Sequence, residues 1–413
     1  MHLVFDPYLT IAGICVIIIF SYIFLLIAKY TKIPSVLLLI TTGVGLRYLS
    51  EVFGISLPDL FSPMNLLGII GLMMIVLEGA LDIEISKEKI WLILSSFFTA
   101  AITLGLIAFG IAYVLQMLLL EESFFKCLLY SIPLATVSSA IVIPSTQNLI
   151  TNKKEFLIYE STFSDILGIL FMDFAIVQYS SKAELAKAIS LNVLFSLISS
   201  FIIAYILIFV FQKIKTKIKF FLFISILGLL FSIGKYFHFS SLLAILVFGI
   251  MLKNYRKFFA GWLKKLISSD DVIKSIHKEF HLITEETSFL IRTFFFIVFG
   301  MTINIQSMLS TELWIITAAI LLVIYLIRLV NLMVFIRSGS IFPELFVSPR
   351  GLVTIILFYK IPEQYKIDGF NEGLLFSVIV ATNIIMMFGL MIWGKNEINI
   401  KPRGESSLSE INY

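Results

Sequence analysis

Three carboxylates lie close together in one apolar run of the chain, and they raise the first chemical question. The run YESTFSDILGILFMDF, residues 159–174, contains Glu160, Asp165 and Asp173. A carboxylate at the depth of a lipid bilayer is costly, so it marks a functional site unless a neighbouring cation neutralises it. A fourth acid of this kind, Glu78, lies in the run IVLEGA. The candidate cations in other apolar runs are Arg292, Arg328 and Arg350.

These residue types can serve two purposes. A guanidinium stays charged and keeps its partner ionised, so a carboxylate paired with arginine is usually structural. A carboxylate without a committed arginine can bind a hard cation such as Na⁺, together with nearby hydroxyl and carbonyl oxygens, and it can equally bind a proton. The two ions then compete for one site. This competition is the chemistry of proton antiport.

The composition indicates which elements must position these side chains. Of the 413 residues, 59% are hydrophobic and only 14% are charged, against roughly 25% charged in soluble proteins. These values predict an all-α polytopic membrane protein without a separate soluble domain. Cys15 and Cys127 lie in predicted spans without nearby partners, which argues against a disulfide framework or a thiolate metal site. The net charge of +4 comes from loops and reports orientation rather than a nucleic-acid partner.

Hydropathy and helix-breaking residues predict about thirteen transmembrane helices. The termini then lie on opposite sides, and the loops on the C-terminal side are much richer in lysine and arginine, so we expect the N-terminus outside and the C-terminus in the cytoplasm. The runs at 239–252 and 348–361 are short for a full crossing and could be broken, extended or re-entrant. The spans are expected near residues 9–29, 33–49, 65–83, 92–119, 125–149, 156–178, 190–211, 219–236, 239–252, 287–306, 312–336, 348–361 and 371–394.

The two halves of the chain resemble each other. KYTKIPSVLLLITTGVGLR (29–47) and KYFHFSSLLAILVFGIMLK (235–253) share a Lys-Tyr start and the register of Ser, Leu and Gly. An odd linker span inverts the second half relative to the first, which is the plan of many secondary transporters. Chance similarity between Leu/Ile-rich helices is the alternative. The expected division is a first inverted repeat of six spans at 1–180, a linker span at 181–215, a second inverted repeat at 216–394 and a short cytoplasmic tail at 395–413.

Inverted repeats predict that matching spans are broken at the membrane midplane. The fifth span, SIPLATVSSAIVIPS, contains two prolines and several hydroxyl residues, and its counterpart opens SPRGLVTI. Proline removes a backbone donor and frees a carbonyl, which hydroxyl side chains or an ion can then satisfy. We expect two broken helices that cross. A simple kinked helix is the alternative.

The segment KNYRKFFAGWLKKLISSDDVIKSIHKEFH, residues 253–281, is basic and amphipathic, like a helix that lies in the headgroup interface. His277 and His281 stand one helical turn apart in it. A metal site or a pH sensor is possible at that spacing, but a solvated helix face is the favoured interpretation, since no third ligand is evident. For Asp173, which lies about 80° around the helix from Asp165, a structural or peripheral role is favoured.

The motifs together resemble a known family. The chain is similar to the monovalent cation/proton antiporter superfamily, the sodium/proton exchangers and their bacterial relatives, over nearly its whole length. The resemblance is carried by KIPSVLLLITTGVGLR, LEGALDI, ATVSSAIV, ESTFSD, RTFFFIVFG and PRGLV. The most specific of these is ESTFSD, which reads Glu-Ser-x-x-Asn-Asp in the electroneutral branch. The resemblance implies a homodimer in a bacterial inner membrane that transports monovalent cations and protons and needs no cofactor.

The resemblance also implies a role for each site residue. Asp165 would be the shared cation and proton site, and Glu160 and Arg328 would form a structural ion pair. Arg292 takes the place where other branches carry a basic residue facing the site, and we group it with Arg350 as structural or coupling. The remaining residues of the expected ion site are Ser161, Thr136, Glu78, Ser164 and Ser138.

Two departures from the family pattern qualify this expectation. The Thr-Asp-Pro of the fifth span is Thr136-Val137-Ser138 here, closer to the Ser-Ser type of the potassium-efflux branch. Ser164 stands where electroneutral exchangers carry Asn and electrogenic ones Asp. These changes leave Asp165 as the one clear titrating group, which suggests one cation per proton.

The predicted function is antiport of a monovalent cation, Na⁺ before K⁺ or Li⁺, against protons by alternating access. The alternative is a member that binds ions without turnover and serves as a membrane sensor or effector. A membrane enzyme is a weaker third reading, because a general base at depth would have to be Asp165 itself.

Overall fold

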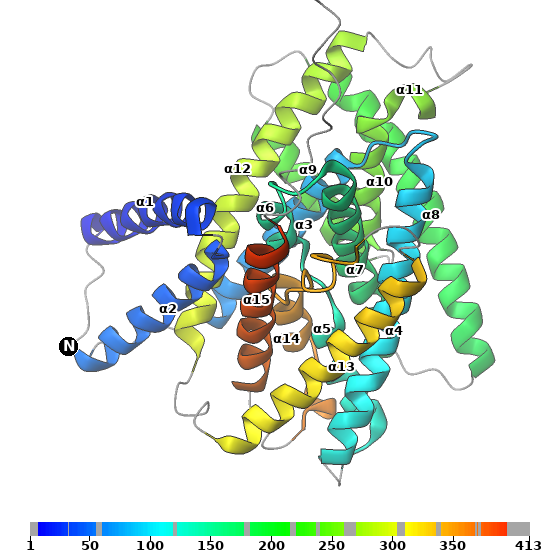
Figure 1. The fold of residues 1–413 in the computed structure, drawn as a ribbon. Coiled ribbons are helices and arrows are strands. Elements are labelled where there is room, and N and C mark those ends of the chain that lie inside the picture. The colour runs from blue at the N-terminus through cyan, green and yellow to red at the C-terminus, as the bar shows by residue number, and fades with distance from the viewer. Residues whose placement is uncertain are drawn as a thin grey trace, which may run out of the picture.

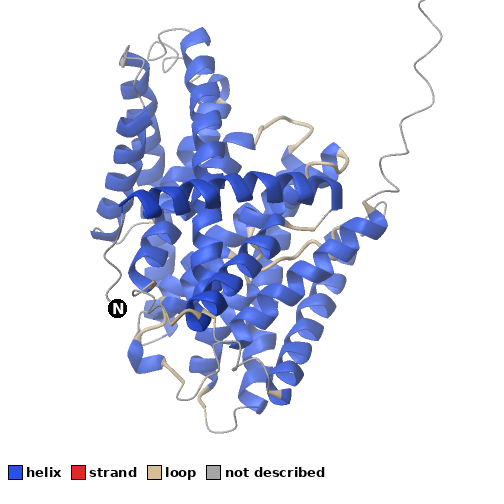
Figure 2. Cartoon of the chain, turned by 90° about the vertical axis from the view of Figure 1, so that its left-hand side faces the viewer, coloured by secondary structure: helices blue, strands red, loops and turns tan. Residues whose placement is uncertain are grey.

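The computed structural model of the chain describes residues 7–31, 33–54, 60–118, 122–176, 182–214, 220–236, 240–259, 270–303, 310–335, 340–367, 370 and 373–394. The described residues form helices joined by loops, and no strand occurs among them (Figures 1 and 2). In hydrocarbon, every backbone polar group must be satisfied within the protein, and a helix does so within one segment. The cytoplasmic tail expected at 395–413 lies outside the described residues.

Fifteen α-helices and one 3-10 turn are described, and each of the thirteen predicted spans coincides with a helix or with a pair of shorter helices. The helices are α1 (Pro7–Thr31), α2 (Ser35–Val52), α3 (Phe61–Asp82), α4 (Ile90–Leu118), α5 (Phe124–Ala135), α6 (Ser139–Ser145), α7 (Thr151–Ile176), α8 (Lys182–Lys213), α9 (Phe220–Tyr236), α10 (Ser241–Lys253), α11 (Tyr255–Phe258), α12 (Asp270–Thr302), α13 (Thr311–Phe335), α14 (Leu352–Tyr359) and α15 (Gly373–Trp393). The 3-10 turn is η3 (Glu363–Tyr365).

Eight segments among the described residues are long and apolar enough to cross a membrane, which confirms the predicted all-helical membrane fold. They lie in α1, α2, α3, α4, the pair α5 and α6, α8, α13 and α15. α7 and α12 have 26 and 33 residues but carry several charged side chains. Some of these charged side chains are buried, namely Glu160 and Asp165 of α7 and Arg292 of α12.

The amphipathic segment 253–281 was predicted to resemble a helix in the headgroup interface, and its second half forms the first turns of a longer helix. Residues 270–286 run without a break into the tenth span as the single helix α12. The buried residues Ile273, Ile276 and Phe280 continue the apolar stripe of the span at helical spacing. Phe280 stacks on Phe223 of α9 with ring centroids 4.0 Å apart, so aromatic packing holds this part of α12 against α9.

The helices form two groups. α2, α3, α8, α10 and α12 pack mainly on one another, and we call them, with α1 and α9, the scaffold group. α4, α5, α6, α7, α13, α14 and α15 form the site group, in which α4 lies against α5, α7 and α13 (Figure 1). Contacts between the groups are fewer and involve mainly α3 against α6, α7 and α14. The boundary between them therefore runs along α3.

Two broken segments meet inside the site group. α5 ends at Ala135, residues 136–138 are extended, and α6 then begins. Residues 347–351 are likewise extended before α14 begins. The Ser138 N–H donates to the Pro349 carbonyl over 2.9 Å, so the two extended stretches touch. The predicted break of the fifth span is confirmed, because α5 and α6 are two helices rather than one kinked helix. On the other side only α14 is a helix, and residues 342–346 form turns.

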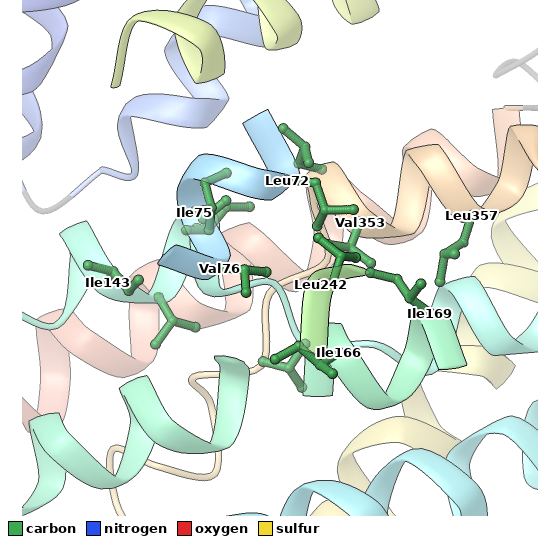
Figure 3. Packing of buried hydrophobic residues seen from close by; sticks show 14 of the residues in the cluster. Leu72, Ile75, Val76, Ile143, Ile166, Ile169, Leu242, Val353 and Leu357 are labelled. Carbon is green, nitrogen blue, oxygen red and sulfur yellow. The ribbon is translucent and has the colours of Figure 1, made fainter. Parts of the chain in front are cut away.

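Apolar side chains fill the space around this crossing. Figure 3 shows residues of α3, α7, α10 and α14 gathered in one cluster, with Ile166 and Ile169 of α7 among the labelled side chains. Both side chains are buried, with exposed fractions of 3% and 8%. An apolar surrounding of this kind strengthens electrostatic interactions inside it and makes each unpaired charge costly.

Candidate functional site

Asp165 is the acid that lies at the crossing. It projects from the middle of α7 and its side chain is completely buried. Its Oδ2 accepts two hydrogen bonds from one residue, the Ser139 hydroxyl at 2.5 Å and the Ser139 N–H at 3.0 Å. Its Oδ1 is buried and accepts no hydrogen bond. One oxygen of the carboxylate is thus held, and the other is available to a ligand.

The predicted hydroxyl residues occupy different places around this carboxylate. Ser161 lies one turn before Asp165 and donates to the Ile158 carbonyl. The Ser164 hydroxyl accepts from the Val137 N–H at 2.9 Å, which fixes the extended stretch against α7. The Ser138 hydroxyl is buried at the crossing and makes no hydrogen bond. All of these side chains are at most 2% exposed, so the crossing is lined with hydroxyl oxygens in a dry setting.

Thr136 joins the two broken segments. Its hydroxyl donates over 2.7 Å to the Pro133 carbonyl, which also accepts from the Thr136 N–H. The same hydroxyl lies 3.3 Å from the Thr354 hydroxyl of α14. Its methyl group packs on Gly168 of α7 so closely that a Cβ added there would overlap it. Gly168 thus lets the crossing approach the helix that carries Asp165.

Glu160 and Arg328 form a buried ion pair. Two parallel hydrogen bonds of 2.7 and 2.9 Å join the guanidinium to the two carboxylate oxygens, and both side chains are at most 1% exposed. Arg328 also donates to the Glu344 and Val347 carbonyls, at the start of the second extended stretch. The pair connects α7, α13 and the crossing, and its charges are committed to each other.

Arg350, which the sequence grouped with Arg292 as structural or coupling, donates to carbonyl groups. It is fully buried, and its guanidinium donates to the Leu134 carbonyl at 2.7 Å and to the Ser348 carbonyl and hydroxyl. A longer bond reaches the Ala135 carbonyl at 3.4 Å. Arg350 therefore caps the C-terminal carbonyls of α5, where a positive charge complements the helix dipole.

Arg292 and Glu78 lie on the scaffold side of the boundary. The Arg292 Nη1 is 3.5 Å from the Glu78 carboxylate of α3 and donates to the Ala140 carbonyl of α6 over 3.3 Å. Glu78 thus lies beside Arg292, and no hydrogen bond joins Glu78 to Asp165 in the structure. The contact with Ala140 is one polar link that crosses from the scaffold group to the site group, one residue after Ser139.

The remaining polar residues noted in the sequence have partners away from the crossing. Asp173 forms an ion pair with Lys360, at the end of α14. His277 is half-buried with its Nε2 3.1 Å from the Leu81 carbonyl, and His281 Nε2 lies 3.0 Å from the Asp82 carboxylate. The solvated face predicted for these histidines is partly what forms, because the His281 side chain is 34% exposed while both histidines contact the last turn of α3.

A cavity of about 740 Å³ opens between the two groups. Arg292, Glu78 and Ala140 are among its lining residues, together with Lys154 at the start of α7. Its acidic lining outnumbers its basic lining, which favours entry of a cation. The residues of this lining that carry charge, with His281, are Glu78, Asp82, Lys154, Glu285, Glu286 and Arg292.

The sequence placed Ser139 and Thr354 in the two breaks but did not assign either residue to the ion site. Ser139 is adjacent to the predicted Ser138, and only the residue at which α6 begins decides which of the two hydroxyls faces Asp165. Thr354 lies in the quoted run SPRGLVTI, but its contact with Thr136 joins residues 218 positions apart. The sequence indicated two hydroxyl-rich breaks, but it did not indicate which hydroxyl residues within them contact each other or Asp165.

Comparison with known proteins identifies the family of the chain. The chain matches the family described as sodium/hydrogen exchanger, transmembrane, over residues 15–393. The chain belongs to this family. It is thus an integral membrane transporter with several spans, of a sodium/proton antiporter family, and not an enzyme.

Two solved structures of one archaeal protein are similar to this exchanger. The structure of the sodium proton antiporter MjNhaP1 from Methanocaldococcus jannaschii at pH 8 has a TM-score of 0.72 and 19% identity, covering 95% of this chain and 99% of that one. The electron-microscopy structure of MjNhaP1 has a TM-score of 0.68 and 21% identity, covering 99% and 100%. At these identities the likeness shows the fold. A comparison with curated proteins found no match.

Proposed function

We propose that this exchanger moves a monovalent cation, Na⁺ before K⁺ or Li⁺, against protons, and that both ions bind at Asp165. The observation that carries the proposal is the state of this carboxylate: fully buried, held through one oxygen by Ser139, and with Oδ1 unpartnered. No ion pair joins it to a lysine, arginine or histidine in the part of the chain that the structure describes. It is therefore free to exchange a proton for a cation.

The charges around the crossing support one cation per proton. Glu160 is neutralised by Arg328 in a bidentate pair, and Glu78 lies beside Arg292. Asp165 is left as the acid whose charge a transported ion must neutralise. A carboxylate with hydroxyl and carbonyl neighbours offers the oxygen ligands that a hard cation such as Na⁺ prefers. Ser138, Ser161, Ser164 and Thr136 are the hydroxyl residues we propose for this neighbourhood.

The two helix groups support a mechanism of alternating access. We propose that the site group carries Asp165 past the scaffold group, along the boundary at α3. The cavity between the groups reaches Ala140, which adjoins Ser139, and Asp165 itself is not among its lining residues. In this state the cavity ends short of the carboxylate. Its lining includes Lys154, which lies on the lysine-rich side that the loop charges assign to the cytoplasm.

The orientation and the oligomer are also proposals. The loop charges favour an external N-terminus and a cytoplasmic C-terminus, in a bacterial inner membrane. A homodimer is proposed from the family resemblance. The peripheral position of α1 is compatible with it, because only 6% of its apolar window is buried within one chain, the lowest value among the eight spans. Labelling of single cysteines in the loops tests the orientation, and mass measurement in nanodiscs tests the dimer.

Transport in proteoliposomes tests the central proposal. An outward Na⁺ gradient is imposed on vesicles that contain a pH-sensitive dye, and Li⁺ and K⁺ gradients are compared. We expect proton movement with the wild-type protein and its loss in Asp165→Asn. Asp173→Asn is the matched control, because Asp173 lies eight residues along the same helix and pairs with Lys360 away from the crossing. Its transport should stay close to wild type.

Two results would contradict the proposal. Wild-type-like proton movement in Asp165→Asn would remove Asp165 from the site. Ion-dependent thermal stabilisation of the wild type without any flux would favour the second function, a non-transporting sensor, for which the valine at position 137 is the supporting feature.

A further inference from the structure

We propose that Ser139 is a positioning residue that holds the Asp165 carboxylate by one oxygen and sets the balance between proton and cation at the other. The inference rests on the proposed function of Asp165. It adds a residue that the family resemblance did not supply and that the spacing of the sequence did not select. It also assigns a distinct role to each oxygen of the carboxylate.

The geometry separates the two oxygens. Both donors of Ser139, the hydroxyl at 2.5 Å and the backbone N–H at 3.0 Å, point to Oδ2. Ser139 and Asp165 are each 0% exposed, so bulk solvent does not compete with either donor in this state. Oδ1 receives nothing from the protein. A carboxylate held in this way cannot rotate freely, and its free oxygen keeps a fixed direction for the incoming ion.

Three other hydroxyls of the crossing are committed to different groups, and the Ser138 hydroxyl makes no hydrogen bond, to Asp165 or to any other residue. Ser164 accepts from the Val137 N–H, and Ser161 donates to the Ile158 carbonyl. The Thr136 hydroxyl donates to the Pro133 carbonyl. None of these bonds can pass to Asp165 without breaking the contact that shapes the crossing. Ser139 is therefore not interchangeable with these three hydroxyl residues.

The hydrogen bond from Ser139 acts on the ionised carboxylate. A donor stabilises the charged form of an acid and so opposes its protonation. The formal charges on the elements packed around Asp165 are already engaged: Glu78 of α3 with Arg292 of α12, Glu160 of α7 with Arg328 of α13, and Arg350 with the carbonyls of α5. Among the described residues, Ser139 is thus the group through which the protein acts directly on the Asp165 charge.

The test compares the pH profile of Na⁺-driven proton flux in Ser139→Ala with that of the wild type. Removal of the hydroxyl favours the protonated carboxylate, so the acidic limb should move by about one pH unit to higher pH, as expected for one hydrogen bond to a charged group. Below that limb the apparent KM for Na⁺ should rise by about tenfold, whereas kcat and KM on the alkaline plateau change little. Ser139→Cys retains a weak donor and should lie between the two profiles.

Ser131→Ala is the matched control. Ser131 is also completely buried, on the same broken segment, and its hydroxyl donates within α5 to the Cys127 carbonyl. Its pH profile should superimpose on that of the wild type. Thermal unfolding of each variant verifies that it is folded, and if Ser139→Ala is not recovered, the intermediate profile of Ser139→Cys carries the test.

The outcomes separate this inference from the function on which it rests. Absence of flux in the wild type with Na⁺, Li⁺ and K⁺ would overturn the proposed function and the role of Ser139 with it. Normal wild-type flux together with an unshifted profile in Ser139→Ala would overturn the role of Ser139 alone. A uniform loss of rate without a shift of the profile would also overturn it, because a merely structural defect has that signature.

Discussion

At the scale of single residues, the acids of the run 159–174 are distinguished by their partners. Glu160 has two strong hydrogen bonds to Arg328, Asp173 has Lys360, and Asp165 has the two donors of one serine. Removal of the partner of a buried charge is strongly destabilising, because the surrounding low dielectric leaves the remaining charge uncompensated. The stability of the fold should therefore depend on the first of these pairs more than on the others.

Removal of either partner of the Glu160–Arg328 pair should destabilise the protein strongly. Glu160→Gln or Arg328→Met leaves one buried charge unpaired, for which a loss of about 3 to 5 kcal/mol is expected. The measurement is the midpoint of thermal unfolding in detergent. The double variant Glu160→Leu with Arg328→Met should recover much of the loss. Single variants as stable as the wild type would show that the pair does not hold the fold.

The charged residues of the site were predictable, but their hydroxyl partners were less so. Asp165, Glu160 and Arg328 could be chosen because an ionised group in an apolar run is costly and therefore stands out. Ser139 could not be chosen over Ser138, since a serine is common in such helices and its role depends on the residue at which α6 starts. The position of Glu78 beside Arg292 was also not readable, because packing between distant helices decides it.

At the scale of elements, the site depends on how closely the broken segments approach α7. The Thr136 methyl group packs closely on Gly168, and the Ser138 hydroxyl and the Ile141 side chain pack closely on Gly351. The breaks themselves could be predicted from their proline, glycine and hydroxyl content. The continuity of α12 could not be predicted, because the charged segment 270–286 has the composition of a surface helix. Aromatic residues of three other helices pack against this segment.

Gly168→Ala should disturb the crossing, since the added methyl group would overlap that of Thr136. Overpacking of this kind costs about 1 to 3 kcal/mol, and a loss of transport should accompany it. Thr136→Ser in the same chain removes the clashing methyl group while keeping the hydroxyl, so the double variant should regain stability. Gly105→Ala on α4, which meets nothing within 4 Å, is the control and should be neutral or slightly stabilising. Full stability of Gly168→Ala alone would contradict the close approach.

The histidines of α12, in the part that precedes its apolar run, should give opposite dependences on pH. The hydrogen bond to Asp82 raises the pKa of His281, so its stabilising contribution is present below the unfolded pKa and is lost as pH rises through the folded one. Burial lowers the pKa of His277, so its effect has the reverse sign. The deficit of His281→Gln in thermal unfolding should shrink from pH 6 to pH 9, whereas that of His277→Gln should grow. Parallel curves for the two variants would contradict the assignment.

At the scale of the whole molecule, transport requires the site group to move relative to the scaffold group. Gly68 of α3 faces Ile356 of α14 across the boundary, where an added Cβ would lie 2.9 Å from the Ile356 Cγ1. Gly110 of α4 faces Val323 of α13 with a similar distance of 2.8 Å, but both belong to the site group. The two places have the same local geometry and differ in whether the boundary passes between them.

A disulfide across the boundary should therefore stop transport. With Cys15 and Cys127 replaced by alanine, oxidation of Gly68→Cys with Ile356→Cys should abolish flux, and reduction should restore it. Oxidation of Gly110→Cys with Val323→Cys should leave flux unchanged, because no relative motion is blocked. Formation of each bond is verified by mass spectrometry. Full transport with the boundary disulfide formed would contradict motion between the groups at this place.

The central claim is that Na⁺ and a proton compete for the Asp165 carboxylate. Calorimetric titration of Na⁺ into the purified protein, in buffers of different ionisation enthalpy, counts the protons released when Na⁺ binds. At the pH where half of the protein is protonated, we predict release of about half a proton per Na⁺, an affinity that weakens about tenfold per pH unit below that point, and no binding to Asp165→Asn. Na⁺ binding that releases no proton, or that persists in Asp165→Asn, would contradict the account.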